Sequence, residues 1–250
     1  MPEITNEKIG LALGGGAVLG AAHVGVVKAL EEADIRIEYI SGTSIGSLVA
    51  ALYAFGISGK EMEKIARDLK WLDISSLTLS NFGLLSNKKM ERFIMEHLGD
   101  VRFEDSEIPL AIIATNLSKG EKVMLNKGRV ADAIMASCCI PGIFVPVEIE
   151  GNLLVDGGIM ENVPIPSLKE IGAKYTIGVD LNAEHTLVEP GNIVEVIINT
   201  IHITLRNITK NQAEKADLLI TPDLSEFNYY QTDQVAELIQ KGYEESNKVF

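Results

Sequence analysis

Residues 9–55 decide the fold class, and they read IGLALGGGAVLGAAHVGVVKALEEADIRIEYISGTSIGSLVAALYAF. A short apolar run at 9–13 leads into three glycines, and a stretch with helical periodicity follows over about 20–33. Residues 36–40 read as a second strand that ends in a tight turn, and an apolar helix is expected over about 47–55. The order strand, helix, strand, helix favours a parallel sheet with crossover helices, so we predict an α/β fold.

The rest of the chain continues as a mixture of strands and helices without an internal repeat or a low-complexity linker. We therefore expect a single domain over residues 1–250, in which the less regular residues 59–100 form a possible cap. Further strands are expected at 109–116, 122–126, 153–155, 175–180 and 218–221. Further helices are expected at 130–136 and 193–214, and a final helix after the last strand extends to about 247.

Composition and charge narrow the classes of partner. The chain has 250 residues, of which 46% are hydrophobic, which is enough for one sizeable core. Its formal net charge is -13. Nucleic-acid binding is not expected, because it depends on neutralising phosphates with Lys and Arg. The negative net charge also disfavours strong attraction to anionic membranes. A lipid substrate held by apolar contact, with transient contact to a membrane surface, remains compatible with this charge.

The two cysteines, Cys138 and Cys139, are adjacent, so a mutual disulfide would be strained. We expect them to be small buried apolar residues. No spaced Cys/His cluster suggests a metal site, and we expect neither a metal nor an organic cofactor. The polar N-terminus has no signal-peptide pattern, and the apolar runs are too short to span a bilayer, so we expect a soluble cytoplasmic protein. The sequence does not indicate an oligomeric state.

The segment GTSIG at residues 42–46 has the form G-x-S-x-G and lies between an expected strand and an expected helix. A nucleophile in such a turn has a strained backbone, and small neighbours, here Gly42 and Gly46, avoid clashes around it. Ser44 then lies at a helix N-terminus, which favours a developing oxyanion, and the amide of Ile45 is a natural donor to it. The pattern also arises by chance, but its position predicts a nucleophile elbow.

A glycine run, Gly14 to Gly16, follows the first strand, and Gly20 opens the next helix. Such a loop lets backbone amides approach a phosphate or an oxyanion. A dinucleotide-binding pattern is not completed, because Leu19 stands where its third glycine belongs, although Asp34 lies where a ribose-binding acid would stand. A P-loop is excluded because no Gly-Lys-Ser/Thr follows. A turn that only permits close helix–sheet packing is the remaining alternative.

Asp156 ends an expected strand and is followed by Gly157 and Gly158. An acid at the carboxyl end of a strand in an open parallel sheet faces the usual ligand crevice, and two glycines would keep that crevice open. The alternative is an ordinary turn, since Asp-Gly is a common turn pair. On its own, Asp156 is therefore a weak indication of a catalytic base.

Together these features resemble the patatin-like phospholipases over most of residues 8–180. The resemblance implies a mostly parallel sheet with helices on both faces, a Ser-Asp dyad at Ser44 and Asp156, and an oxyanion hole made by the glycine loop. It rests on three blocks of sequence: IGLALGGGAVLGAAHVGVVKAL, ISGTSIGSLVAALYA and AIMASCCIPGIFVPVEIEGNLLVDGGIMENVPI. The last block, with its I-P-G, D-G-G and N-x-P elements, is the most specific.

The glycine loop departs from the family pattern, which usually has G-G-G, one residue, Arg or Lys, and then Gly. Here the resemblance maps the oxyanion donors to Gly15, Gly16 and Ala17, so alanine stands at the third glycine and Leu19 replaces the basic residue. An alanine keeps its amide, provided that its backbone angles suit a residue with a Cβ. The loss of the basic residue removes a positive charge near the oxyanion.

We therefore expect a lipid acyl hydrolase, an esterase of the phospholipase A or lysophospholipase type. One alternative is a non-catalytic lipid-binding protein on the same fold. Another is a Ser-Asp-His esterase, for which His185 and His202 lie in the required chain order. We expect His23 to be structural, near the elbow, and His97 to be exposed. The apolar residues 71–85 form either a core-packed cap or a lid that admits acyl chains.

Overall fold

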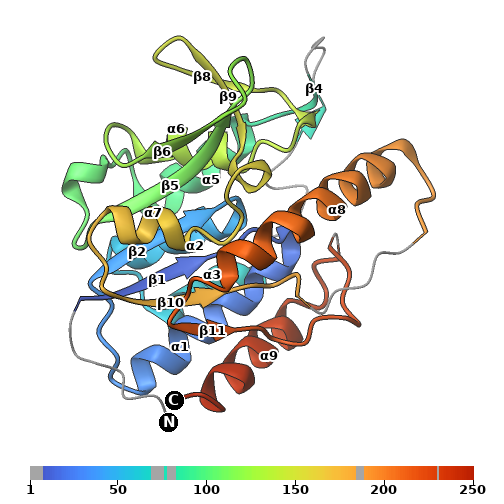
Figure 1. The fold of residues 1–250 in the computed structure, drawn as a ribbon. Helices are drawn as coiled ribbons and strands as arrows, with labels where there is room; N and C mark the ends of the chain where they lie inside the picture. Colours follow the sequence, from blue (N-terminus) through green and yellow to red (C-terminus); the bar gives the residue numbers. More distant parts are fainter. Residues whose placement is uncertain (1–7, 69–75, 78–82, 184–188, 230) are drawn as a thin grey trace.

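A central sheet organises the molecule (Figure 1). The computed structural model describes residues 8–68, 76–77, 83–183, 189–229 and 231–250, and within them this sheet has eight strands. The strands run in the order β11-β10-β1-β2-β5-β9-β8, and β6 pairs with β5. Their bounds are β1 Ile9–Leu13, β2 Tyr39–Thr43, β5 Leu110–Asn116, β6 Glu121–Leu125, β8 Val147–Ile149, β9 Asn152–Asp156, β10 Tyr175–Val179 and β11 Leu218–Ile220.

The middle of the sheet is parallel and its far side is antiparallel. β11, β10, β1, β2 and β5 pair in parallel, whereas β6 and β9 run antiparallel to β5, and β8 runs antiparallel to β9. Every residue of β1 and of β5 is buried. Continuous apolar runs are typical of parallel strands that are covered on both faces, and the apolar run at 9–13 was recognisable for this reason.

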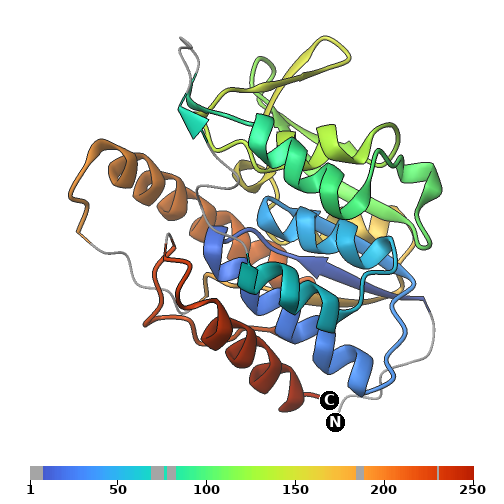
Figure 2. The same ribbon diagram turned by 180° about the vertical axis from the view of Figure 1, so that it is seen from behind.

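Helices cover both faces of the sheet, as the two opposite views show (Figure 1, Figure 2). The short α7 and the long α8 lie on one face, and the other described α-helices lie on the opposite face. The expected fold class is confirmed. The bounds are α1 Ala21–Glu32, α2 Ile45–Ala54, α3 Gly59–Asp68, α5 Lys88–Leu98, α6 Val130–Ser137, α7 Ile165–Glu170, α8 Ile193–Ala213 and α9 Val235–Asn247.

The C-terminal helix α9 packs tightly along α1, and two glycines make this possible. A Cβ at Gly25 of α1 would lie 1.9 Å from the carbonyl oxygen of Ile239, and a Cβ at Gly242 of α9 would lie 2.0 Å from that of Ala22. A side chain at either glycine would therefore separate the helices. This contact keeps the start of α9 beside the glycine loop.

One predicted strand is displaced in the structure, and the predicted cap is only partly described. The strand expected at 36–40 is displaced to β2 (39–43), because the strand continues straight into the G-x-S-x-G turn. The expected cap at 59–100 contains α3, α5 and a small sheet in which β3 Ser76–Leu77 pairs with β4 Gly83–Ser86, and β4 pairs with β7 Gly142–Phe144. Residues 69–75 and 78–82, which include most of the predicted lid, lie outside the described residues.

None of the helices in the described part of the chain combines the length and the apolar composition that crossing a bilayer requires.

Candidate active site

Ser44 occupies a sharp turn between β2 and α2. Its backbone angles are φ 53 and ψ -129, a conformation that a residue with a side chain adopts only when its surroundings enforce it. The glycines on either side allow this turn. A Cβ at Gly42 would lie 2.4 Å from the carbonyl oxygen of Gly46, and a Cβ at Gly46 would lie 2.2 Å from that of Leu13. The turn therefore has the strand-to-helix position and the backbone strain that the G-x-S-x-G pattern predicts.

Hydrogen bonds from α6 and from α2 hold this strained turn. The Ser44 amide donates to Oγ of Ser137 at 2.8 Å, and that hydroxyl donates to the Ile113 carbonyl of β5 at 2.6 Å. On the other side, Oγ of Ser47 donates to the Ser44 carbonyl at 2.6 Å. Ser137 is fully buried, so its bridge between the turn and the sheet is shielded from water.

The strand pairing explains how Ser44 and Asp156 meet, although they are far apart in the sequence. β6 pairs with residues 112–116 along one edge of β5, so β2 and β9 share the other edge. Along that edge Thr43 is opposite Ile113, and Asp156 is opposite the next residue, Ala114. β2 runs parallel to β5 and β9 runs antiparallel to it, so the carboxyl ends of the two strands meet, and Ser44 and Asp156 face each other there.

The Asp156 carboxylate is almost fully buried, with 8% of the residue exposed. Burial raises the pKa of Asp156 to about 6, and this effect is opposed by hydrogen bonds from the Ser44 side chain and from the Gly158 amide, the latter at 2.8 Å. A Cβ at Gly157 would lie 2.1 Å from the Ile113 carbonyl oxygen, so the D-G-G turn requires a glycine here. The carboxylate is ionised at neutral pH and lies close to the Ser44 hydroxyl.

The glycine loop passes directly beside the elbow. A Cβ at Gly15 would lie 3.2 Å from the Ser44 Cβ. The Gly15 amide donates to Oδ1 of Asn162 at 3.2 Å, and the Gly15 carbonyl accepts from Nδ2 of Asn182 at 2.8 Å. Two asparagine side chains therefore fix the peptide groups on either side of Gly15, and its amide is already engaged.

The next two amides of the loop are differently placed. Within the described residues, no hydrogen-bond acceptor is assigned to the amides of Gly16 and Ala17. These residues begin a short 3-10 helix, η1 Ala17–Gly20, and Ala17 has a φ of 49. The third-glycine position of the family pattern is thus a left-handed residue, which explains why glycine is usual there and why alanine is strained. The Ile45 amide likewise begins a helix, α2.

A second layer of side chains supports the two asparagines. Nδ2 of Asn162 donates to Oγ1 of Thr209 on α8 at 3.1 Å. Oδ1 of Asn182 accepts from the Tyr229 hydroxyl at 2.9 Å. No sequence motif by itself predicts these contacts or that of Ser137. Asn162 was visible as the asparagine of the N-x-P element, whereas Asn182, Thr209 and Tyr229 lie after the blocks that carry the resemblance.

His23 is structural, as expected. It is fully buried in α1, and its Nε2 donates to the Gly14 carbonyl at 2.7 Å. Burial lowers the pKa of His23 to about 4, so the ring is neutral at neutral pH. His97 is half-buried rather than exposed, because its ring packs edge-on against Phe93, with the ring centroids 4.6 Å apart. His185 and the side chain of His202 lie outside the described residues.

The adjacent cysteines are free thiols, and neither is suited to nucleophilic attack. Cys139 is fully buried, and burial raises its pKa to about 12. Burial and the nearby Asp156 charge raise the pKa of the half-buried Cys138 as well. Both thiols are therefore protonated at neutral pH. Among the described residues, no group of three or more His, Cys, Asp or Glu side chains is placed to hold a metal ion.

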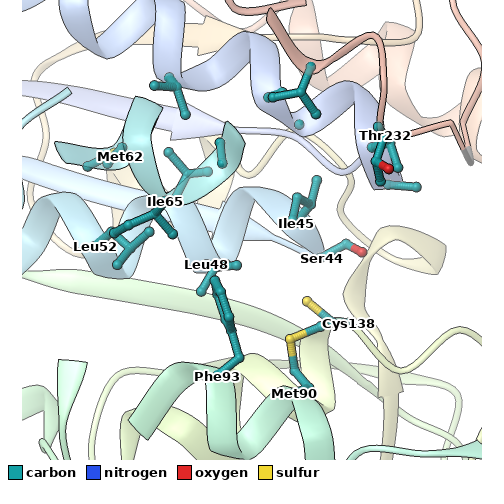
Figure 3. Close-up of a pocket in the computed structure, with 18 of the residues that line it drawn as sticks. Ser44, Ile45, Leu48, Leu52, Met62, Ile65, Met90, Phe93, Cys138 and Thr232 are labelled. Atoms are coloured by element: carbon teal, nitrogen blue, oxygen red, sulfur yellow. The ribbon is translucent and has the colours of Figure 1, made fainter. Parts of the chain in front are cut away.

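A cavity opens beside the Ser44 hydroxyl and extends along α2 (Figure 3). Its volume is about 970 Å³ when the open solvent in front of it is included. Its lining comes from α1, α2, α3 and α5, with Cys138, Ile140 and Phe144 near the elbow and Thr232 and Val235 at the start of α9. Among the described residues that line it, none is charged. Ser44 thus borders a space suited to an apolar group.

A comparison with protein families identifies this arrangement. The sequence model of the family described as patatin-like phospholipase matches residues 11–169, which include the glycine loop, the elbow and Asp156. The chain belongs to the patatin-like phospholipase family. The resemblance carried by the three sequence blocks is thereby confirmed.

Curated relatives of this patatin-like chain carry the name NTE. An uncharacterized NTE family protein of Mycobacterium bovis is 35% identical over 181 residues, covering 71% of this chain and 50% of that protein. The lysophospholipase NTE1 of Scheffersomyces stipitis is 34% identical over 188 residues, covering 72% of this chain and 12% of that protein. The matches span at most about half the length of these relatives.

Solved structures share the patatin-like fold at low sequence identity. The crystal structure of VipD from Legionella pneumophila superposes with a TM-score of 0.56 at 15% identity, covering 97% of this chain and 66% of that chain. The type III effector protein ExoU superposes with a TM-score of 0.50 at 14% identity, covering 97% and 52%. At these identities the likeness concerns the fold alone.

Proposed function

We propose that this chain is a serine hydrolase that cleaves acyl esters of lipids, with Ser44 as nucleophile and Asp156 as general base. The observation that carries the proposal is the meeting of β2 and β9 on one edge of β5, which sets the strained Ser44 against a buried carboxylate. Its pKa of about 6 lies close to neutral pH, where a base is ionised and still takes up a proton effectively. Family membership supports the same chemistry.

In the first half-reaction, Asp156 takes the proton of the Ser44 hydroxyl while Oγ attacks the ester carbonyl carbon. The tetrahedral intermediate collapses, the bond to the alcohol oxygen breaks, and Asp156 returns the proton to the leaving alcohol. In the second half-reaction, a water molecule gives a proton to Asp156 and attacks the acyl-serine. The fatty acid then leaves, and Ser44 regains its proton. The two half-reactions balance without a metal or an organic cofactor.

The oxyanion is proposed to be stabilised by backbone amides. Gly16 and Ala17 of the glycine loop supply donors, and the Ile45 amide at the start of α2 adds a third. Gly15, which the family pattern also suggests, contributes mainly to the shape of the loop, because its amide donates to Asn162. The positive end of α2 favours the developing charge.

The proposed substrate is an amphipathic lipid ester whose acyl chain enters the apolar cavity. The cavity begins at Ser44, so an acyl group bound there presents its carbonyl to the hydroxyl. A relative that is named a lysophospholipase makes single-chain phospholipids suitable test substrates. Reaching such lipids requires at most transient contact with a membrane surface.

Hydrolysis of lysophosphatidylcholine and of p-nitrophenyl esters by the purified chain tests this function. Ser44→Ala should abolish turnover, and Ser118→Ala, which changes an exposed serine, should not alter it. A double variant, His185→Ala with His202→Ala, should keep most of the activity, whereas a loss of activity in the folded double variant would support a Ser-Asp-His triad. A folded wild-type chain that binds lipid but hydrolyses no ester would support the lipid-binding alternative.

A further inference from the structure

The cavity follows one face of α2 and has two distinct ends (Figure 3). Ile45, Leu48 and Leu52 lie along this face at helical spacing, starting next to Ser44. Figure 3 shows Ser44 on the side of Thr232, and Leu52 and Met62 on the opposite side. The elongated shape suits a linear group that extends from the reacting carbonyl.

At the end remote from Ser44, two of the lining side chains belong to the buried apolar core. Leu52 of α2 is 4% exposed and Met62 of α3 is 1% exposed. Ser44, by contrast, is only half-buried. A linear chain can therefore enter near Ser44 but cannot leave past Leu52 and Met62 without displacing core side chains, which is costly in a close-packed interior.

The spacing along α2 sets a length. Leu52 lies eight positions after Ser44 in the sequence. At 1.5 Å per residue this is ~12 Å along the helix axis, which an extended hydrocarbon with C–C bonds of ~1.5 Å spans with about eight to ten carbons. A longer acyl chain would have to bend or leave its end outside the cavity.

We infer that this cavity is an acyl-chain site of fixed depth, in which Leu52 and Met62 limit the chain to about eight to ten carbons. The inference rests on the proposed function, because it assumes that the acyl carbonyl lies at Ser44. It assigns a specificity-determining role to two residues that do not contact the reacting atoms.

A chain-length profile tests this inference. The value of kcat/KM is measured for p-nitrophenyl esters from acetyl to hexadecanoyl at concentrations below their aggregation. For the wild-type chain we expect a maximum near octanoyl to decanoyl, with a fall of about tenfold or more for chains a few methylenes too long. Met62→Ala removes three heavy atoms at the closed end, so its maximum should move to longer esters.

Three further variants test the same inference without relying on Met62→Ala alone. Leu52→Ala should lengthen the preferred chain as Met62→Ala does, and Ala66→Leu, which adds bulk inside the cavity, should shorten it. Met135→Ala is the matched control, because Met135 is half-buried on α6 and does not line the cavity. A flat profile, a maximum at hexadecanoyl, or a shift in Met62→Ala no larger than in Met135→Ala would overturn the inference.

A binding measurement separates this inference from the proposed function. Ser44→Ala protein is titrated with decanoate and with hexadecanoate by calorimetry, alone and combined with Met62→Ala. Tighter binding of decanoate, reversed by Met62→Ala, would support the fixed depth even if no ester were hydrolysed, in which case only the proposed function would fail. Hydrolysis without any length preference, together with equal binding of both acids, would leave the proposed function standing and overturn the fixed depth.

Discussion

At the scale of single residues, Asp156 has an ionisable carboxyl in a place that favours its neutral form. Its pKa in the folded chain is about 6, above the ordinary value of 3.8 that applies to the unfolded chain. Between about pH 4 and 6 the folded state therefore binds more protons, and the free energy of unfolding falls as the pH rises through this window. Above pH 6 the carboxylate is ionised in both states, and this loss of stability is complete.

Asp156→Asn should therefore separate activity from stability. Loss of the base should lower kcat by at least about a hundredfold at pH 8. The free energy of unfolding at pH 8 should rise by about 1–3 kcal/mol, because no charge is buried. Urea unfolding and ester hydrolysis measure the two effects. The kcat/KM of the wild type should decrease as the pH is lowered through an apparent pKa of about 6. A variant that keeps its activity within tenfold would contradict the role of Asp156 as base.

Ala17 replaces the third glycine of the family pattern and has a left-handed backbone. A glycine substitution usually lowers the free energy of unfolding, but at this position we expect it to raise that free energy. Ala17→Gly should raise the free energy of unfolding by about 0.5–1 kcal/mol, because the Cβ strain is relieved. Ala21→Gly is the control. Ala21 has a right-handed backbone with a φ of -57, so its replacement by glycine should lower the stability of the protein. If urea unfolding showed the same loss of stability in both variants, the backbone of Ala17 would not be strained.

At the scale of elements, Ser137 connects α6, the elbow and β5. Ser137→Ala leaves the Ser44 amide and the Ile113 carbonyl without this partner, so we expect a loss of about 1–3 kcal/mol in stability and at least a tenfold lower kcat with little change in KM. Ser41→Ala is a matched control: its buried hydroxyl donates to the Pro164 carbonyl at 3.0 Å. If both variants lost kcat equally, the bridge would have no particular role in positioning Ser44.

The elements that the sequence predicted best are those with a continuous apolar run or a glycine signature. β1 and β5 are buried on both faces and therefore have continuous apolar sequences. The turn at 42–46 needs its glycines for steric reasons, so it is also recognisable in the sequence. No local sequence pattern predicts that β2 and β9 pair with the same edge of β5. Register depends on contacts between distant segments, and nothing local to Thr43 or to Asp156 encodes it.

The supporting side chains of the site were harder to predict for a related reason. Asn182 and Tyr229 act on the glycine loop from far along the chain, and each is an ordinary polar residue in its local sequence. Their roles arise only when the fold places them around Gly15. Ser137 lay inside a quoted block, yet a serine before two cysteines does not by itself indicate a hydrogen bond to the elbow.

At the scale of the whole molecule, acid stability should depend on His23. Its pKa is about 4 in the folded chain against an ordinary 6.5, so the unfolded state binds more protons between these values. The contribution of neutral His23 is complete above pH 6.5 and is lost as the pH falls towards 4, by up to about 3 kcal/mol. His23→Gln, which can still donate to the Gly14 carbonyl, should be less sensitive to acid.

Urea unfolding of the wild type and of His23→Gln across pH 4 to 7 measures this difference. Asp156 contributes with the opposite sign over part of this range, but equally in both proteins, so the difference between the two curves isolates His23. Parallel loss of stability in both proteins would contradict the assignment of acid sensitivity to this ring.

Covalent labelling by a fluorophosphonate measures whether Ser44 is an activated nucleophile. We predict that the folded wild-type chain gains one adduct by intact mass, that peptide mapping places the adduct on Ser44, and that Ser44→Ala is not labelled while Ser118→Ala is. Asp156→Asn should label far more slowly than the wild type. A folded wild-type chain that gains no adduct, or one whose adduct maps to another residue, would contradict the assignment of Ser44 as the nucleophile.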